Sequence, residues 1–246
     1  MTDAELAAAV AEEAGQLLLA IREEGLNGRA LGDAGDRRAN KLILDRLRDA
    51  RPDDALLSEE STDDRARLDS RRVWIVDPVD GTREYGEART DWAVHVGLAI
   101  DGVATTGAVA LPDKQIVFRT DRPIPPPPAP ATLRMVVSRT RPAPEAISVA
   151  NMLGAELVPM GSAGAKAMAV VSGDADIYLH SGGQYEWDSA APVAVAGAAG
   201  LHCSRIDGSP LVYNRPDVYL PDLLICRHEH VDRIFAALAS ARTTNG

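Results

Sequence analysis

The sequence predicts a layered α/β protein made of two halves, the first with an antiparallel sheet and the second with a mixed sheet. Residues 92–120 alternate apolar runs with short turn pairs such as Asp101-Gly102, which is typical of an antiparallel meander. From Leu133 onward, strand-like runs alternate with helical patterns, which favours an α/β arrangement. Six prolines within residues 123–130 fit neither a central strand nor a helix, so they predict a stiff connector.

The connector divides the chain into parts that we expect to fold as two subdomains. The predicted parts are residues 1–122, which form an N-terminal α+β subdomain, residues 123–131, which form the connector, and residues 132–246, which form a C-terminal α/β subdomain.

Two helices are expected at the N-terminus. Thr2 and Glu5 have the spacing of a capping box, and apolar residues recur at helical intervals, so residues 3–24 predict an amphipathic helix. A glycine-rich loop is expected to lead to Asp36, at the start of a second helix that Pro52 closes. At such a position Asp36 is either an N-cap or a functional acid.

Short strands are expected next, at residues 55–58 and 73–76, with a charged loop at 61–72 between them. The first strand ends at Glu59 and Glu60. The second leads into a further pair of acids, so both strands present carboxylates at one end.

The second strand stops at Asp77, and Pro78 is expected to end its ladder because proline lacks a backbone N–H. Gly81 permits a tight reversal, so Asp77 and Asp80 converge while the carbonyl of Val79 turns toward the same point. Oxygen ligands of this kind suit Mg²⁺. The alternative is a plain turn without chemistry.

In the C-terminal half the pattern predicts further strands and helices in alternation. Strands are expected at residues 133–137, 156–160, 176–179, 201–205 and 223–226, and helices at residues 144–153, 164–171, 187–199 and 229–241.

The composition limits the kinds of partner. A net charge of -10 over 246 residues argues against nucleic acid and an anionic membrane, but not against a phosphorylated small molecule bound through divalent cations. Cys203 and Cys226 predict buried thiols and a reducing compartment. Acids within residues 1–21 exclude a signal peptide and a spanning helix, so we expect a cytoplasmic protein. The oligomeric state stays open, with a homodimer as one option.

Acids therefore stand at four separated places, and their surroundings resemble the inositol monophosphatase superfamily of Mg²⁺-dependent, lithium-sensitive phosphatases. The resemblance covers nearly the whole chain, in the right order, and it is carried by Asp36, Ser58-Glu59-Glu60-Ser61, Trp74-Ile75-Val76-Asp77-Pro78-Val79-Asp80-Gly81-Thr82 and Trp187-Asp188-Ser189-Ala190-Ala191-Pro192.

This resemblance implies a sandwich of alternating α and β layers (αβαβα) with the site between the halves. It implies two or three Mg²⁺ ions, the first held by Glu59, Asp77 and the Val79 carbonyl and the second by Asp77, Asp80 and Asp188. It also implies that Asp36 and Thr82, with help from Glu59, orient the attacking water, and that Li⁺ inhibits the enzyme.

Within the superfamily, three blocks are similar to the CysQ-type branch of 3′(2′),5′-bisphosphate nucleotidases. They are Gly81-Thr82-Arg83-Glu84-Tyr85, Val137-Ser138-Arg139-Thr140-Arg141 and Gly161-Ser162-Ala163-Gly164-Ala165-Lys166. The resemblance implies substrate contacts from Gly81, Thr82, Ser138, Arg141, Ser162 and Lys166. The alternatives are that Lys166 is a solvated helix residue and Arg141 a surface charge.

The resemblance implies a phosphatase that removes the 3′-phosphate of adenosine 3′,5′-bisphosphate (PAP) to give AMP, a recycling step of sulfate assimilation, and that also converts 3′-phosphoadenosine 5′-phosphosulfate (PAPS) to adenosine 5′-phosphosulfate. The alternatives are the same chemistry on inositol 1-phosphate or fructose 1,6-bisphosphate, and a metal- and phosphate-binding module without turnover.

Other motifs favour ordinary structural roles. The five histidines form no zinc-type cluster, and His228 and His230 are expected at the surface or as caps of the last helix. Asp174 and Asp176 predict a turn. Tyr185 lies in a predicted loop near the acids, where it either contacts a base or packs.

Overall fold

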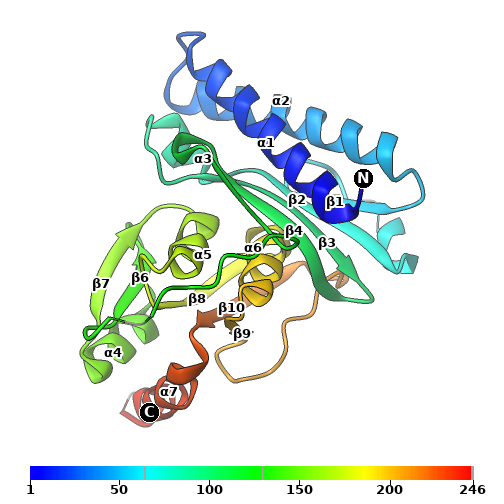
Figure 1. The fold of residues 1–246 in the computed structure, drawn as a ribbon. Coiled ribbons are helices and arrows are strands. Elements are labelled where there is room, and N and C mark those ends of the chain that lie inside the picture. Colours follow the sequence, from blue (N-terminus) through cyan, green and yellow to red (C-terminus); the bar gives the residue numbers. More distant parts are fainter. Residues whose placement is uncertain (64, 129, 245–246) are drawn as a thin grey trace.

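The computed structural model describes residues 1–63, 65–128 and 130–244, with side chains to residue 241. Its helices and sheets alternate in layers, as predicted (Figure 1). The helices are α1 (Asp3–Arg22), α2 (Gly28–Ala50), α3 (Thr82–Gly86), α4 (Pro144–Leu153), α5 (Ala163–Ser172), α6 (Glu186–Ala198) and α7 (Val231–Thr244). The strands are β1 (Ala55–Ser58), β2 (Arg72–Asp80), β3 (Ala93–Ile100), β4 (Val103–Leu111), β5 (Ile116–Arg119), β6 (Arg134–Ser138), β7 (Glu156–Met160), β8 (Ile177–Tyr185), β9 (His202–Ser204) and β10 (Tyr219–Cys226). Short 3₁₀ turns are η1 (Ala66–Asp69), η2 (Pro112–Lys114) and η3 (His228–His230).

The first sheet has the strand order β1-β2-β3-β4-β5. Its pairs are antiparallel, as predicted, except that β1 runs parallel to β2. Helices α1 and α2 pack on one face of this sheet, and α6 packs on the other. The apolar side chains of β2 and β3 are therefore buried on both faces.

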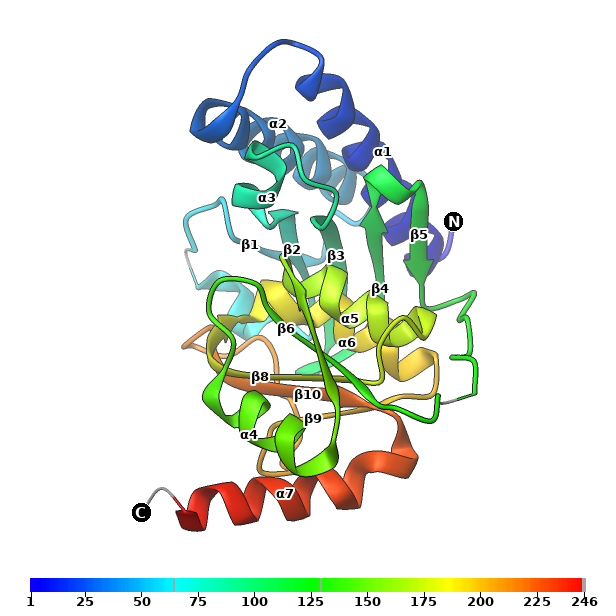
Figure 2. The ribbon, with the colours of Figure 1, turned by 90° about the vertical axis from the view of Figure 1, so that its left-hand side faces the viewer.

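The second sheet has the order β7-β6-β8-β10-β9 and is mixed, as predicted. Strand β6 runs parallel to both β7 and β8, whereas β10 runs antiparallel to β8 and β9. Helices α5 and α6 lie between the two sheets, and α4 and α7 cover the outer face of the second sheet (Figure 2). This middle layer of helices places α5 and α6 beside strands of both sheets.

Helix α2 begins earlier than predicted, so the prediction that Asp36 starts this helix is wrong. The helix spans Gly28–Ala50, and Asp36 lies buried in its interior. Two of the glycines taken for a loop, Gly32 and Gly35, lie inside the helix and are packing residues. A Cβ atom at Gly32 would lie 2.8 Å from Thr82 Cγ2, and one at Gly35 would lie 2.7 Å from Tyr85 Cε1. Because glycine has no Cβ atom, α2 approaches α3 closely at these two positions.

Strand β2 continues through Pro78 to Asp80, so the prediction that this proline ends the strand is wrong. Its pairing with β3 shifts register between Asp77, opposite His95, and Asp80, opposite Ala93. The missing N–H of Pro78 falls within this bulge, where no ladder hydrogen bond is lost. The bulge turns two acids of one strand toward the same side.

Strand β8 is longer than the predicted 176–179 and takes in the segment expected to be a loop. Gly182 and Gly183 have φ of 108° and 93°, which glycine adopts without strain, so the strand bends and still pairs with β10. Gln184 and Tyr185 consequently sit on a hydrogen-bonded strand rather than on a free loop.

The remaining expectations mostly hold. The capping box of Thr2 and Glu5 is present, and both cysteines are free. The proline-rich connector has neither helix nor strand over its described residues, and residue 129 of the connector and residue 64 of the charged loop lie outside the described part. None of the helices described combines the length and apolar character needed to cross a lipid bilayer.

The turn predicted at Asp174 and Asp176 is present between α5 and β8. Asp176 is also fully buried, with Arg134 Nε and Arg227 Nε each 3.3 Å from its carboxylate. His230, expected at the surface or as a cap, is buried directly before α7. The burial of Asp176 depends on segments distant in sequence, which local pattern does not reveal.

Candidate active site

A cleft of about 680 Å³ opens between the two halves of the molecule. Carboxylates line one end of it, from Glu59, Asp80 and Asp188. Cationic side chains line another part, including Arg141 and Lys166. The cleft therefore joins an acidic end to a basic wall.

Three acids meet at the acidic end. Asp77 and Asp80 come from the end of β2, and Asp188 comes from the first turn of α6. Each offers a carboxylate oxygen, and these oxygens lie within 4.8 Å of one another. Asp77 and Asp80 are nearly inaccessible to solvent.

Glu59 extends the acid cluster from the end of β1. Its carboxyl group lies close enough to that of Asp77 for the two to repel each other when both are charged. Burial and neighbouring acids, chiefly Glu59, raise the pKa of Asp77 well above its usual value. Burial of the carboxyl group, followed by the nearby charge of Asp188, raises the pKa of Glu59 to about 7, although the residue as a whole is exposed.

These features fit a divalent cation of the Mg²⁺ type. The donors are hard oxygens, and their negative charge is so poorly compensated that protons are retained near neutral pH. Burial and the charge of Asp80 raise the pKa of Asp188 to about 6 in the same way. A bound cation would replace these protons and remove the repulsion.

Asp80 differs from its neighbours because the fold already compensates its charge. Its carboxylate accepts hydrogen bonds from the backbone N–H groups of Ala163 (3.1 Å) and Gly164 (2.5 Å) at the start of α5, and His95 Nε2 lies 3.2 Å from it. Burial alone would raise the pKa of Asp80, but His95, then Lys166 and the Gly164 N–H, lower it. Asp80 is therefore an anion held in a fixed orientation.

His95 is a member of the site that sequence reasoning missed. It is fully buried on β3, and its Nδ1 lies 3.0 Å from the carbonyl oxygen of Trp187. It thus links Asp80 to the residue before Asp188. The only local signal was a lone polar residue in the apolar run of Val94 and Val96.

A hydroxyl and a further acid lie beside the cluster. Thr82 Oγ1 is 3.1 Å from the carbonyl oxygen of Val79 and 3.3 Å from Asp36 Oδ1. Burial, then the charges of Glu60 and Glu59, raises the pKa of Asp36 to about 7. The Thr82 hydroxyl has one proton and therefore donates to one of these acceptors at a time.

The turn that carries Thr82 is tight. Gly81 precedes it with φ of 88°, and a Cβ atom there would lie 3.0 Å from Ser162 Cβ. Glycine therefore brings the start of α3 against the start of α5.

The wall opposite the acids begins at α5. Ser162 caps this helix by accepting a 2.9 Å hydrogen bond from Ala165 N–H. Lys166 is 4% exposed, so the alternative of a solvated helix residue is wrong. Its ammonium donates to the carbonyl oxygens of Gly161 and Ser162, and burial lowers its pKa.

Ser138 and Arg141 lie farther along the same wall. Ser138 Oγ accepts a 3.2 Å hydrogen bond from the backbone N–H of Arg141, and both residues line the cleft. Arg141 is exposed at the rim. The sequence-predicted residues that line the cleft are Glu59, Asp80, Gly81, Ser138, Arg141, Ser162, Lys166 and Asp188. Asp77 belongs to the acid cluster, and Val79, Thr82 and Asp36 follow it through hydrogen bonds. Arg141 is the most solvent-exposed of the predicted substrate contacts.

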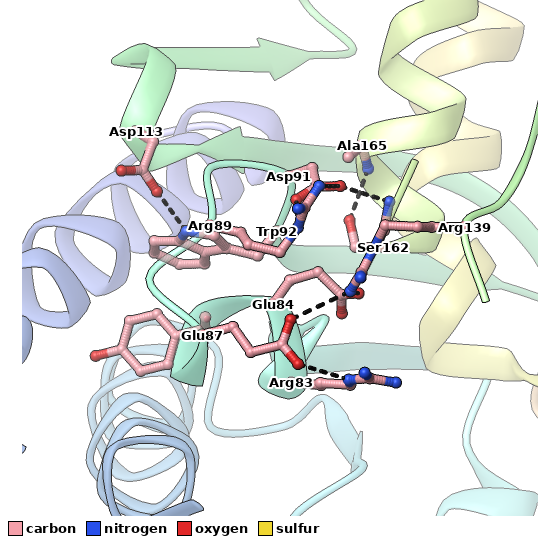
Figure 3. A network of polar contacts seen from close by, with 12 residues as sticks. Arg83, Glu84, Glu87, Arg89, Asp91, Trp92, Asp113, Arg139, Ser162 and Ala165 are labelled. Atoms are coloured by element: carbon pink, nitrogen blue, oxygen red, sulfur yellow. Dashed lines mark hydrogen bonds and ion pairs between the residues drawn. The ribbon is translucent and has the colours of Figure 1, made fainter. Parts of the chain in front are cut away.

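A polar network joins the two halves behind this wall (Figure 3). Arg139 Nη2 is 2.8 Å from Glu84 Oε1, and Asp91 accepts a 2.7 Å hydrogen bond from Gly161 N–H. The backbone carbonyl of Asp91 also accepts from Ser162 N–H at 3.1 Å. Sequence analysis did not single out Glu84, Arg139 or Asp91 as individual residues, because the partners in each pair are far apart in the chain.

Tyr185 lies at the edge of the cleft. Its ring stacks on that of Trp187 with centroids 4.9 Å apart and an interplanar angle of 15°, and it remains 47% exposed. An exposed, fixed aromatic face of this kind suits contact with a planar group.

The sequence and the fold are similar to those of known proteins. The model of the inositol monophosphatase family matches residues 2–242. A Mycobacterium leprae protein named 3′-phosphoadenosine 5′-phosphate phosphatase is 56% identical over 243 residues, covering 92% of this chain and 90% of that protein. The 3′(2′),5′-bisphosphate nucleotidase CysQ of Escherichia coli K12 is 30% identical over 208 residues, covering 76% and 81%. Among solved structures, CysQ from Bacteroides thetaiotaomicron has a TM-score of 0.82 at 26% identity, covering 92% and 97%.

Proposed function

The chain belongs to the inositol monophosphatase family, and from this premise we propose that it is a Mg²⁺-dependent phosphatase that removes the 3′-phosphate from adenosine 3′,5′-bisphosphate. The products are AMP and inorganic phosphate. The name and the 56% identity of the Mycobacterium leprae relative support this substrate. The observation that carries the chemistry is the convergence of Asp77, Asp80 and Asp188 within 4.8 Å.

We assign two cation positions to the acids. Glu59, Asp77 and the Val79 carbonyl would hold the first ion, and Asp77, Asp80 and Asp188 the second. A third ion near Glu59 remains part of the proposal. When bound, Mg²⁺ would neutralise phosphoryl oxygens and make a nearby water easier to deprotonate.

The residues of the chain then handle the proton of the attacking water. Thr82 Oγ1 lies between the Val79 carbonyl and Asp36, so water held near the acids can pass a proton through this hydroxyl to the Asp36 carboxylate. The water oxygen forms a bond to phosphorus, the bond from phosphorus to the 3′ oxygen breaks, and the 3′ oxygen leaves as a hydroxyl after taking a proton. No residue needs to form a covalent intermediate.

The basic wall would hold the second phosphate of the substrate. Gly81, Thr82, Ser138, Arg141, Ser162 and Lys166 are the proposed substrate contacts. Positive side chains and N–H groups at the start of a helix attract phosphate oxygens. Lys166 is held by two carbonyl oxygens, so its charge stays fixed toward this part of the cleft.

A phosphate-release assay tests the proposal. The substrates are adenosine 3′,5′-bisphosphate, its 5′-phosphosulfate analogue, inositol 1-phosphate and fructose 1,6-bisphosphate, each with and without Mg²⁺ and Li⁺. We expect the two adenosine compounds to give the highest kcat/KM, with release that requires Mg²⁺ and falls with Li⁺. A higher kcat/KM for the inositol or fructose compound would show that the proposed substrate is wrong. Absence of phosphate release from all four compounds would indicate a binding module without turnover.

The oligomeric state is a separate matter. The homodimer considered from the sequence remains a prediction, and light scattering after size-exclusion chromatography would test it.

A further inference from the structure

Gln184 contributes an unusual polar group to the cleft wall. Only 7% of the residue is exposed, although it lines the cleft. Its Nε2 donates a 2.8 Å hydrogen bond to the Tyr178 hydroxyl. Its Oε1 is buried and has no hydrogen-bond partner in the part of the chain that the structure describes. Buried polar atoms without a partner are rare, because the group loses its hydration without gaining a hydrogen bond.

The surroundings fix this amide in place. Tyr178 is 1% exposed, and Lys166 Nζ lies 5.4 Å from its ring centroid. Gln184 itself pairs with Leu220 of β10, so its backbone belongs to a sheet. The unpaired oxygen is therefore an acceptor held by the fold, and a donor on a molecule in the cleft would supply its partner.

The location of this acceptor limits the partner. The next residue, Tyr185, donates its backbone N–H to Asp188 Oδ2 at 2.6 Å, and Asp188 belongs to the acid cluster. Gln184 and Asp188 both line the cleft, so a substrate whose phosphate lies at the acids can place a neighbouring group against Gln184. Phosphate oxygens are themselves acceptors and cannot pair with Oε1, whereas a hydroxyl on the neighbouring carbon is a neutral donor.

We infer that Gln184 is a specificity-determining residue whose Oε1 accepts a hydrogen bond from the hydroxyl on the carbon next to the phosphate-bearing carbon. This inference rests on the proposed function and deepens it. In adenosine 3′,5′-bisphosphate that hydroxyl is the ribose 2′-hydroxyl. The chain would therefore select ribonucleotides over 2′-deoxyribonucleotides.

The preference should be substantial. A buried acceptor without a protein partner gains a hydrogen bond when the hydroxyl binds and leaves a buried polar group unpaired when it does not. Sites built to bond a substrate hydroxyl reject analogues that lack it. We expect kcat/KM for the ribo compound to exceed that for the deoxy compound by about 10-fold or more, mainly through KM.

The experiment measures Mg²⁺-dependent phosphate release from adenosine 3′,5′-bisphosphate and 2′-deoxyadenosine 3′,5′-bisphosphate. It uses the wild-type chain, Gln184→Met, and Ser181→Ala as a matched loss of one polar group on the same strand but outside the cleft lining. We expect Gln184→Met to bring the ratio of kcat/KM values to within about 2-fold of unity, whereas Ser181→Ala keeps the wild-type ratio. A structural role for Gln184 would lower both rates equally and leave the ratio unchanged. If Gln184→Met does not fold, Gln184→Leu replaces it.

Each outcome decides the inference. The inference is overturned if the wild type has a ribo-to-deoxy ratio of kcat/KM near unity. It is also overturned if Gln184→Met keeps the wild-type ratio. A ratio near unity combined with poor turnover of inosine 3′,5′-bisphosphate would show that the base is read instead, which also overturns it. Absence of release from both adenosine compounds rejects the proposed function and the inference with it. Turnover with a ratio near unity rejects the inference alone.

Discussion

Single acids in the cleft differ in how well the protein compensates their charge. Asp77 and Glu59 are neighbouring like charges, whereas Asp80 accepts hydrogen bonds from two backbone N–H groups and faces His95. The pKa of Asp77 is raised and that of Asp80 is lowered for this reason. Residues of one type and one strand therefore enter the proposed metal site in different states.

Replacing Asp80 tests the second cation position. We expect Asp80→Asn to abolish measurable Mg²⁺-dependent phosphate release, because an amide lacks the negative charge that attracts the ion. Circular dichroism should show that the fold is retained. The exposed Asp49→Asn is the matched control and should keep normal turnover. Normal turnover of Asp80→Asn would contradict the assignment.

The basic residues Lys166 and Arg141 are tested by comparing two substrates. We expect Lys166→Ala or Arg141→Ala to raise KM for adenosine 3′,5′-bisphosphate by about tenfold or more, since hydrogen bonds to charged groups contribute about 1.5–3 kcal/mol. The KM for a simple sugar monophosphate should change much less. Equal changes for both substrates would place these residues outside the pocket for the second phosphate.

At the scale of elements, helix α5 connects the two parts of the cleft. Its first N–H groups bind Asp80, its cap is Ser162, and Lys166 lies one turn farther on. Helix α5 also packs against strands of both sheets. The position of this one helix therefore sets the distance between the acids and the basic wall.

Gly164 is the residue that permits this close approach. A Cβ atom at 164 would overlap the His95 imidazole and lie 3.0 Å from Asp80 Oδ2. We expect Gly164→Ala to weaken Mg²⁺ binding measured by calorimetry and to lower kcat, because the start of α5 must move away.

The control for this change is Gly197→Ala in α6. A Cβ atom there meets nothing within 4 Å, so we expect unchanged Mg²⁺ affinity and a stability equal to or above that of the wild type. Equal Mg²⁺ affinity in both variants would show that α5 does not position Asp80.

At the scale of the whole molecule, the cleft concentrates negative charge between two sheets. The pKa values of Asp36 and Glu59 rise to about 7 and that of Asp188 to about 6, from ordinary values of 3.8 to 4.5. Between pH 4 and 7 the folded chain therefore binds more protons at these groups than the unfolded chain does. Their contribution to the free energy of unfolding falls as pH rises through this range. The lowered pKa of Asp80 gives the opposite pH dependence of the free energy of unfolding, but it concerns one group, whereas the raised pKa values concern three.

Mg²⁺ should reverse this loss, because a bound cation replaces the protons. We expect the rise in Tm produced by a fixed Mg²⁺ concentration to be larger at pH 8 than at pH 6. Differential scanning calorimetry at both pH values, with and without the ion, measures it. The Asp49→Asn variant should follow the wild type, and an equal rise at both pH values would contradict the assignment of the acids.

The division into subdomains at residues 123–131 stays a prediction. The connector is free of helix and strand where it is described, but α5 and α6 of the C-terminal part pack against the first sheet. Separate expression of residues 1–122 would show whether that part folds without this support.

The sequence by itself determined the elements whose cause is local. The capping box set the start of α1, turn pairs set the meander, and the acids at the end of β2, with the other acidic motifs, identified the family. The sequence did not reveal that Gly32 and Gly35 belong to a helix, because that depends on packing against α3. It also did not reveal that Pro78 lies within a strand, because that depends on the register of pairing with β3.

Only the tertiary structure decided what surrounds each acid. His95 and the N–H groups of α5 contact Asp80, and the amide of Gln184 lines the cleft, from elements far apart in the chain. The burial and the electrostatic environment of a side chain depend on tertiary contacts. The spacing of residues in the sequence does not specify those contacts. The chain's pattern thus fixed which residues could do chemistry, and packing fixed their charge and orientation.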